Sequence, residues 1–598
     1  MIKPTYHCNE LRKEDTGKEA CLAGWVSSWR DHGGVVFIDI RDNKGVTQVV
    51  FGREKSGLPE EKEKELNSAA RKLRNEYVIA VKGEVIPRPE GTENKKIDTG
   101  GIEVVCHELE VLNPCSELPF DFKKMDEVGE ENRLKYRYLE MRAGKLKDNL
   151  VFKHRFFQAT RRYFTDKDFC EIETPFLTKS TPEGARDFLV PSRINPGSFY
   201  ALPQSPQLFK QILMVGGFMR YFQIVKCFRD EDLRQDRQPE FTQLDLEMSF
   251  IDEEDIMSIL EEYISNIFSE LLGKKIQLPF RRIPYAEAMQ KYGSDKPDLR
   301  IPVEIVDITG MAKGCAFKVF KNAADGGGVV RGIKIPDAER ISLAVIDKVT
   351  KEISVFGAKG LAWMRHKDDG LQSQITKFFG PQELVELQEV FDTKPGDILL
   401  FIADKSAVAE KSLGYLRTKF FEPDPADYQL LWVVDYPLFE KDEESGNWTP
   451  MHHPFTSAHP DDMEILRSGS TDDFGKVRSR AYDMVLNGSE IGGGSIRIHS
   501  IEDQKTIFKS LGIEEKESQE KFGFLLKALS YGAPPHGGFA FGVDRLVTMM
   551  LGLNSIRDVI PFPKTQKAYS PLSDAPSPVS DKQLRELAVK VDLPDDNL

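Results

Sequence analysis

The sequence predicts a multidomain α+β protein. Its 598 residues are too many for a single domain. The first 112 residues contain five short apolar segments of strand type, and later strand-like segments follow one another with short connections. Because sequential strands joined by short loops form antiparallel sheets, we expect a small β-barrel followed by a larger antiparallel-sheet domain.

Residues 1–113 have the pattern of that barrel. The candidate strands are 21–29, 35–40, 46–51, 77–86 and 102–112, with a helical segment at 60–74. A helix after the third of five strands is the layout of an OB-fold. Such barrels commonly bind single-stranded nucleic acid through exposed aromatic side chains. Trp29, Phe37 and Phe51 are candidates for that role, although barrel aromatics more often fill the core.

The rest of the chain divides by composition. Residues 114–140 lack periodicity and carry Pro and Gly, which predicts a linker. The antiparallel-sheet domain is predicted in two parts, 141–288 and 426–565, because the strand pattern stops and resumes. An inserted α+β unit at 289–425 separates them. Residues 566–598, rich in Ser, Pro and Asp, are expected to form a loosely ordered C-terminal extension.

Composition excludes several classes of protein. A net charge of −14 argues against coating of nucleic acid by bulk electrostatics. The seven cysteines form no CxxC pair, so we expect no zinc, and their odd number fits a reducing cytosol. The sequence contains no signal peptide and no apolar run of membrane-spanning length, which predicts a cytoplasmic protein without a membrane partner. A basic stretch at 131–162 is a candidate phosphate-backbone surface.

Residues 227–247 concentrate charge between two predicted strands. Arg229 follows the aromatic strand 221–228, and Asp230 and Glu231 come next, before the alternating strand 241–250. An arginine at a strand end beside acidic groups suits a site for a polyphosphate and its metal. Taken alone, a charged hairpin tip in solvent is the simpler interpretation.

Three further stretches favour a site. Gln207 and Lys210 lie three apart on one helix face, where a lysine could receive a carboxylate. Asp483 and Glu490 flank a turn before three glycines and offer hard oxygen ligands for Mg²⁺. A glycine-rich strand, 537–542, leads into a helix whose first turn holds Arg545, a favourable place for an anion. The chain has no P-loop and no GxGxxG motif, so nucleotide binding would belong to another class.

These motifs resemble those of the bacterial-type aspartyl-tRNA synthetases of class II, over almost the whole chain. The strand ending at Pro175 resembles the family's first motif, which forms the dimer interface and implies a homodimer. FRDEDLR with QPEFTQLD (228–245) resembles the second motif, and GGFAFGVDRL (537–546) the third. QSPQLFKQ (204–211) and GARDFLVPSR (184–193) match at the level of the aspartate enzymes. The inserted unit resembles the extra domain of bacterial members.

The resemblance also implies roles for residues. For L-aspartate it implies Glu183, Ser205, Gln207, Lys210, Arg229, Asp245, His452, His453 and Arg497. For ATP it implies Arg229, Asp230, Glu231, Gln238, Phe241, Glu490, Gly542, Val543, Asp544 and Arg545, and for Mg²⁺ it implies Asp483 and Glu490. Arg234 and Arg237 receive no role.

In the barrel, Phe37, Gln48 and Glu103 match anticodon-binding positions of the family. His32 and Gly91 stand where members of relaxed specificity typically carry His and Gly. The implied activity is formation of aspartyl-adenylate from ATP and its transfer to tRNA(Asp) and also tRNA(Asn).

Other interpretations stay open at this point. A strictly discriminating enzyme would charge tRNA(Asp) alone. An asparaginyl or lysyl synthetase would activate another amino acid, and an asparagine-forming enzyme would not need the barrel. A non-catalytic OB-fold binder of single strands would leave Arg229, Asp483, Glu490 and Arg545 without a purpose.

Overall fold

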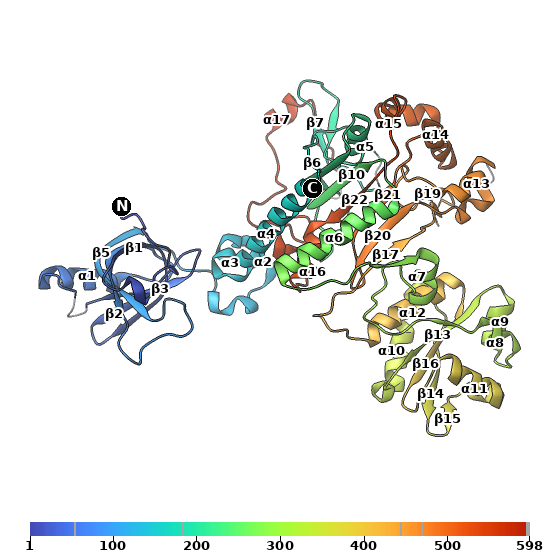
Figure 1. The fold of residues 1–598 in the computed structure, drawn as a ribbon, viewed down its shortest axis with the longest axis horizontal. Helices are drawn as coiled ribbons and strands as arrows, with labels where there is room; N and C mark the ends of the chain where they lie inside the picture. Colours follow the sequence, from blue (N-terminus) through green and yellow to red (C-terminus); the bar gives the residue numbers. More distant parts are fainter. Residues whose placement is uncertain (53–55, 182–183, 443–444, 469–470, 594–598) are drawn as a thin grey trace. The chain divides into compact units, whose positions relative to one another are not determined.

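The computed structural model describes residues 1–52, 56–181, 184–442, 445–468 and 471–593. The chain forms two compact units, Met1–Val128 and Gly129–Leu598, each of which is described by itself (Figure 1). Within the described ranges, no helix is both long and apolar enough to cross a membrane.

The N-terminal unit is a closed β-barrel. Its strands are β1 (Glu19–His32), β2 (Val35–Arg41), β3 (Val46–Phe51), β4 (Val78–Pro87) and β5 (Ile102–Asn113), in the order β1-β2-β3-β5-β4. Helix α1 (Glu60–Lys72) lies between β3 and β4, so the predicted OB-fold layout is confirmed. Alternate Val, Ile and Leu side chains fill the interior. Phe51 belongs to this core, with 1% exposure, and Trp29 packs against it and donates its indole N–H to Ala70 O at 3.0 Å.

The larger unit is built on an antiparallel sheet with parallel pairs at its edges. In the described part of the chain it has eight strands, in the order β11-β17-β20-β21-β22-β10-β9-β6. Their bounds are β6 (Cys170–Glu171), β9 (Arg220–Phe228), β10 (Glu240–Ser249), β11 (Arg281–Pro284), β17 (Leu430–Val434), β20 (Ala481–Leu486), β21 (Ser489–Ile496) and β22 (His536–Gly542). The pairs β11–β17 and β6–β9 are parallel.

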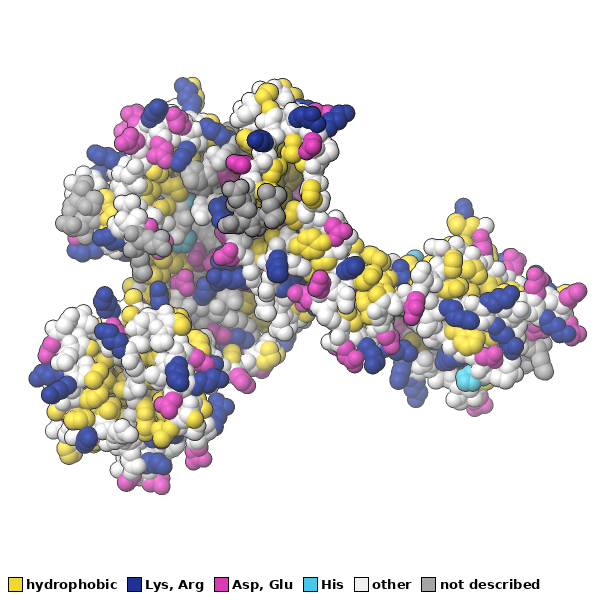
Figure 2. Space-filling view, turned by 180° about the vertical axis from the view of Figure 1, so that it is seen from behind, with side chains coloured by type: hydrophobic (Ala, Val, Ile, Leu, Met, Phe, Trp, Pro, Cys, Tyr) yellow, Lys and Arg dark blue, Asp and Glu magenta, His cyan; other side chains and the backbone are white. Residues whose placement is uncertain are grey.

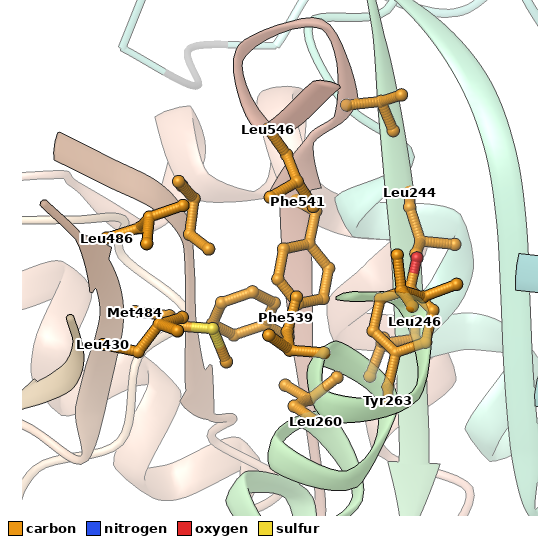
Figure 3. Close-up of a cluster of buried hydrophobic side chains, with 14 of the residues drawn as sticks. Leu244, Leu246, Leu260, Tyr263, Leu430, Met484, Leu486, Phe539, Phe541 and Leu546 are labelled. Atoms are coloured by element: carbon orange, nitrogen blue, oxygen red, sulfur yellow. The ribbon is translucent and has the colours of Figure 1, made fainter. Parts of the chain in front are cut away.

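Period-two alternation in the central strands separates an apolar face from a polar one. On β10, Leu244 and Leu246 enter the core, and on β22 Phe539 and Phe541 do so (Figure 3). Helices α4 (Lys145–Asp166), α6 (Glu253–Leu272) and α16 (Val543–Met550) also contribute to this core, together with strands β9, β17, β20 and β21. The intervening residues of the same strands therefore face the other side of the sheet.

The insertion expected at 289–425 contains a separate sheet. Its strands run in the order β12 (Val306–Asp307), β13 (Val329–Ile335), β16 (Ile398–Asp404), β14 (Ala362–Lys367) and β15 (Gly370–Gln372), all antiparallel. Two apolar clusters lie between it and α8 (Thr309–Gly314), α9 (Lys318–Asp325), α10 (Leu343–Ile353), α11 (Pro381–Val390) and α12 (Ser406–Phe420). In α12 the buried Arg417 donates to the carbonyl oxygens of Val303 (2.6 Å) and Ile301 (3.2 Å), which fastens the insertion's first segment.

The larger unit also contains further short strands and helices. They are β7 (Leu189–Pro191), β8 (Phe199–Ala201), β18 (Phe439–Lys441), β19 (Trp448–Pro450), α5 (Gln207–Val215), α7 (Tyr285–Tyr292), α13 (Met463–Ser468), α14 (Ile501–Ser510), α15 (Glu515–Leu529) and α17 (Asp581–Glu586).

The predicted linker 114–140 differs from the structure in its second half. Residues from Gly129 onward belong to the larger unit and form α2 (Glu130–Lys135) and α3 (Arg137–Ala143), and Gly144, at φ 125°, separates α3 from α4. Arg137 is 2% exposed and donates to the carbonyl oxygens of Ile560 (2.9 Å) and Pro561 (3.0 Å). A contact with residues more than 400 positions away leaves no local pattern, so the sequence did not reveal it.

The basic stretch 131–162, a candidate phosphate-backbone surface, forms several ion pairs within the protein. Arg133 and Arg137 pair with Glu140, Arg161 pairs with Glu171, and Arg162 with Glu270. On the face that Figure 2 shows, Lys and Arg side chains are spread in small groups among acidic ones. At least four of the ten Lys and Arg side chains in the stretch are therefore paired with acidic side chains of the protein, which weakens the case for a phosphate-backbone surface there.

Candidate functional site

A cavity of about 530 Å³ lies on the polar side of the large sheet. Its walls come from α5, from the loop between β9 and β10, from β10 itself, from β20 to β22, and from the start of α16. The predicted residues that line it are Ser205, Gln207, Lys210, Arg229, Glu231, Gln238, Phe241, Asp245, His452, His453, Asp483, Glu490, Arg497, Gly542, Asp544 and Arg545. The structure therefore brings together residues that are up to 340 positions apart in the sequence.

Among the described residues, Asp230 and Val543 are predicted site residues that do not line the cavity. Glu183 lies outside the described residues. Asp230 is exposed beside Arg186, and the side chain of Val543 is fully buried in the apolar core, so that only its backbone could meet a ligand.

At one end of the cavity, Lys210, Asp245 and Arg497 line the wall and pair with the buried Glu247; we call these four residues the inner end. All four are at most 2% exposed. Lys210 Nζ lies 3.0 Å from Asp245 Oδ1 and 3.4 Å from Glu247 Oε2, and Arg497 Nε donates to Glu247 Oε1 at 2.9 Å. Two cations and two carboxylates thus compensate one another, as buried charges require.

The carboxyl groups of the inner end differ in pKa. For Glu247, burial opposes ionisation, but Arg497 and Lys210 outweigh it and hold the pKa below its ordinary value. For Asp245, burial prevails over Lys210 and raises the pKa. Within the described residues, Asp245 Oδ2 has no hydrogen-bond partner, and neither has Gln207 Nε2. A buried acceptor and a buried donor are therefore available to a small ligand that carries both kinds of group.

His453 and Ser495 fix the orientation of Arg497. Arg497 Nη1 lies 2.7 Å from His453 Nε2 and 2.7 Å from Ser495 Oγ. Because a guanidinium only donates, His453 Nε2 must accept, which requires a neutral imidazole. Burial and the charge of Arg497 lower the pKa of His453 well below its ordinary value, in agreement with this assignment.

The other end, the outer end, consists of Arg229, Asp483, Glu490 and Arg545. The repulsion of Asp483, together with burial, raises the pKa of Glu490. Asp483 Oδ1 is buried and has no hydrogen-bond partner in the described part of the chain, although His452 Nε2 lies 3.6 Å away. Two carboxylates that repel each other at a cavity wall fit a divalent cation, and Mg²⁺ typically takes one or two protein carboxylates together with phosphate oxygens.

The cations of the outer end are only partly paired. The Arg229 guanidinium lies 5.1 Å from the centre of the Phe241 ring, and its Nε has no hydrogen-bond partner within the described residues. Arg545 donates to Glu490 O at 2.6 Å and to Asp236 Oδ2 at 3.2 Å. Positive groups beside a carboxylate pair can hold an anion that arrives with its own metal ion.

Two predicted nucleotide residues are held by the protein itself. Gln238 accepts from Lys564 N at 2.8 Å and donates to Lys564 O at 3.0 Å, which fixes the amide at the cavity wall. The carboxylate of Asp544 accepts from Thr242 N at 2.8 Å and pairs with Lys153. Both oxygens of Asp544 therefore have a protein partner, which fixes the start of α16 at the cavity wall, and its contact with a nucleotide stays a prediction.

In the N-terminal unit, the three predicted anticodon residues differ in exposure. Phe37 is half-buried on the outer face, with the ring of the exposed His32 at 6.0 Å. Gln48 and Glu103 are 6% and 2% exposed, and Gln48 Nε2 donates to Glu103 Oε2 at 2.9 Å. Gly91 adopts φ 80° with open space around it.

Glu247 is the main residue without a predicted role. The signal was present in the sequence, because Glu247 lies two positions after Asp245 on one strand and so shares its face. Gly538 on the neighbouring strand belongs to the same arrangement, since a Cβ there would lie 1.7 Å from Glu247 Oε2. The sequence gives Gln204 no role beyond its place in the motif 204–211, because its contacts with the cavity rim depend on the tertiary structure.

Comparisons with known proteins agree with this arrangement. A family model described as class II tRNA synthetases (D, K and N) matches residues 129–566, and one described as an OB-fold nucleic acid binding domain matches residues 20–112. The chain is 53% identical to the aspartate–tRNA(Asp/Asn) ligase of Aquifex aeolicus, covering 99% of this chain and 98% of the relative. It is 52% identical to the ligase of the same name from Persephonella marina, covering 100% and 99%.

Among solved structures, the chain resembles asparaginyl-tRNA synthetase from Pyrococcus horikoshii, crystallised with asparaginyl-adenylate. The TM-score is 0.58 at 22% identity, over 94% of this chain and 99% of that one. At this identity the likeness supports the fold alone.

Proposed function

The chain belongs to the class II tRNA synthetases, and on this basis we propose that it is an aspartate–tRNA ligase that charges both tRNA(Asp) and tRNA(Asn). The observation that carries the proposal is the inner end, where buried Lys210 and Arg497 converge. Full-length relatives named aspartate–tRNA(Asp/Asn) ligase support the choice of amino acid and of both tRNAs.

The inner end suits the side chain of aspartate. Lys210 and Arg497 would bind its carboxylate, with His453 keeping Arg497 in position. Asparagine offers a neutral amide in the same place, so each charge-assisted bond, worth about 1.5–3 kcal/mol, would be lost. The free Oδ2 of Asp245 would accept from the ammonium group, and Gln207 and Ser205 would complete the pocket.

The first step forms aspartyl-adenylate. An oxygen of the substrate's α-carboxylate attacks the α-phosphorus of ATP, the bond to the bridging oxygen breaks, and pyrophosphate leaves. The nucleophile is already an anion, so no general base is needed. Arg229 would hold the α-carboxylate against the phosphate and stabilise charge on the phosphoryl oxygens.

The outer end would hold ATP. Phe241 and Arg545 would enclose the adenine, and Gln238 and Glu231 would contact the nucleotide. Mg²⁺ bound to Asp483 and Glu490 would neutralise phosphate charge. In the second step a terminal ribose hydroxyl of tRNA attacks the aspartyl carbonyl, and AMP leaves.

Recognition of tRNA is proposed for the N-terminal unit. Half-buried Phe37 is suited to stack on a base, and Gln48 and Glu103 offer polar edges beside the outer face. His32 and Gly91 would permit both anticodons. A homodimer through the first motif is also proposed, since Phe176 and Leu177, directly after Pro175, are 47% and 54% exposed.

ATP–pyrophosphate exchange with aspartate, asparagine and lysine tests the amino acid. Exchange with aspartate alone is expected, and its absence would overturn the proposal. Charging of tRNA(Asp) and tRNA(Asn) transcripts tests the relaxed specificity. Similar rates are expected, whereas failure with tRNA(Asn) would favour a strictly discriminating enzyme.

The substitution Phe37→Ala tests the N-terminal unit independently of the catalytic reaction in the larger unit. It should leave exchange unchanged and weaken tRNA charging by roughly 10- to 100-fold, because base–aromatic stacking is worth about 1–3 kcal/mol. Equal loss in both assays would contradict an anticodon role. Sedimentation of the wild-type chain at several concentrations tests the homodimer, which a monomer at all concentrations would exclude.

A further inference from the structure

Gln204 holds the cavity rim by three hydrogen bonds. Its Oε1 accepts from Ala185 N at 2.9 Å, and its Nε2 donates to Ala185 O at 2.7 Å and to Asp187 Oδ1 at 2.6 Å. The side chain is 3% exposed, and these three bonds, within the described residues, all lead to one short segment, Gly184–Asp187. Gly184 and Ala185 line the cavity beside Ser205 and Gln207.

The amide of Gln204 pairs with the peptide groups of Ala185 as one strand pairs with another. Reversing its oxygen and nitrogen would bring donor to donor and acceptor to acceptor, so this pairing fixes the amide orientation. The bond to Asp187 is charge-assisted and therefore strong. Ser180 Oγ donates to the second oxygen of Asp187 at 2.7 Å, which completes the attachment.

The same segment touches the loop that carries Arg229. Asp230 N donates to Arg186 O at 3.1 Å, and Arg186 Nε donates to Asp230 O at 3.2 Å. The segment between Gly184 and Asp187 therefore joins the amino-acid side of the cavity to the nucleotide side. Its attachment on the amino-acid side is Gln204.

We propose that Gln204 is a positioning residue that fixes Gly184–Asp187 at the rim of the amino-acid pocket and thereby sets the affinity for aspartate. Gln204 acts through this segment, since both polar atoms of its side-chain amide are hydrogen-bonded to Ala185 and Asp187. The inference rests on the proposed function for its substrate, but the position of the segment can be measured without activity.

Gln204→Glu is the sharpest test, because it keeps the shape and the acceptor but replaces two donors by an oxygen that faces Ala185 O and Asp187. The KM for aspartate in pyrophosphate exchange should rise about tenfold, equivalent to ~1.4 kcal/mol. The KM for ATP should change by less than about twofold, because the backbone bond to Asp230 remains. A KM for aspartate within twofold of wild type overturns the proposal.

Adding Asp187→Asn to Gln204→Glu gives a rescue test. The new amide can donate to the introduced carboxylate, so the double variant should recover at least a third of the lost affinity for aspartate on a logarithmic scale. A double variant as weak as Gln204→Glu contradicts the contact described here. Gln382→Glu, an exposed glutamine on α11, is the matched control and should leave both KM values unchanged.

Hydrogen exchange of the peptide that contains Gly184–Asp187 supplies a readout besides activity. The exchange should be faster in Gln204→Glu than in wild type, and unchanged exchange contradicts the proposal. If wild type shows no aspartate-dependent exchange of pyrophosphate, the proposed function fails and this measurement still decides the role of Gln204. Gln204→Met, which removes all three bonds without adding charge, serves if the first variant does not fold.

Discussion

The two ends of the cavity solve the problem of buried charge in opposite ways. At the inner end, Lys210 and Arg497 face Asp245 and Glu247, so every charge has a partner within the protein. At the outer end, Asp483 and Glu490 repel each other strongly enough to raise the pKa of Glu490. The inner end is preorganised before any ligand arrives, whereas the outer end depends on charges that a ligand brings.

This difference follows from what each end is proposed to bind. Aspartate is small, and its groups can enter a network that is already neutral at little reorganisation cost. ATP arrives as a polyanion with a divalent cation, so unbalanced carboxylates and partly paired arginines are suitable partners for it. The two ends should therefore respond differently to substitution.

Glu247→Gln should give the largest effect, because it leaves buried Lys210 and Arg497 with one carboxylate between them. Removing one partner of a buried charge network costs about 3–5 kcal/mol. Urea denaturation should show that loss in the free energy of unfolding. Glu254→Gln is the control: its pair with Arg282 lies at 2.8 Å but Glu254 is 64% exposed, so a change below about 1 kcal/mol is expected. Equal losses of stability in the two variants would show that the charge network of the inner end contributes no more than an exposed ion pair.

Arg229→Ala should remove chemistry at the outer end while the fold persists, because Arg229 lies at the cavity wall and not in a compensated network. Pyrophosphate exchange should fall by about 10²- to 10³-fold, as for the loss of one stabilising group in other enzymes. Arg234, exposed in the same loop, provides the comparison, and its replacement by Ala should change the rate by less than about twofold. Near wild-type exchange in Arg229→Ala would rule out the assigned role.

Asp483→Asn should act through the metal. The Mg²⁺ concentration for half-maximal exchange should rise about tenfold, with little change in stability without Mg²⁺. Gly493→Ala should act in the same direction, because its Cβ would lie 2.5 Å from Asp483 Oδ1. Gly310→Ala, whose Cβ would meet nothing within 4 Å, is the control. If the Mg²⁺ dependence of Asp483→Asn were the same as that of wild type, Asp483 would not be a ligand of the metal.

The smallest expected effect is the pH dependence of folding stability that Glu247 causes at the inner end. The folded-state pKa of Glu247 is lowered, so its contribution to stability is present above the unfolded pKa of about 4.3 and is lost as pH falls through the folded value. The stability difference between wild type and Glu247→Gln should therefore be constant near pH 7 and shrink below about pH 4. Denaturation of both proteins between pH 3 and 7 measures it, and a difference that grows on acidification would reverse the assignment.

The local pattern of apolar and polar residues predicts the strands of the barrel more accurately than it predicts the segments that connect the domains. The five strands of the N-terminal unit begin and end within a few residues of their predicted limits. This agreement is expected, because alternation of apolar and polar side chains directly indicates which face of a strand is buried. The strand that is predicted to end at Pro175 is shorter in the structure, where β6 contains only Cys170–Glu171, since only these two residues pair with β9. Local composition predicts a linker at 129–140, because the burial of Arg137 depends on a segment far away in the sequence.

The candidate site shows the same division. Arg229, Lys210, Asp483, Glu490 and Arg497 could be named from motifs and are brought to one cavity. Asp544 also lines the cavity, but its bonds to Thr242 and Lys153 could not be predicted from the motif, and its contact with ATP stays a prediction. Whether a carboxylate serves a ligand or its own protein depends on its neighbours in space, which spacing along the chain does not give.

The sequence by itself determined the elements, their buried faces and the kinds of charged group available for chemistry, because these depend on residues close together along the chain. Only the tertiary structure decided how the charges are shared. Glu247 meets Arg497 across 250 residues, and Gly538 leaves the space for that contact. Charge compensation in a buried site depends on distances of a few ångströms, and only the folded sheet sets them.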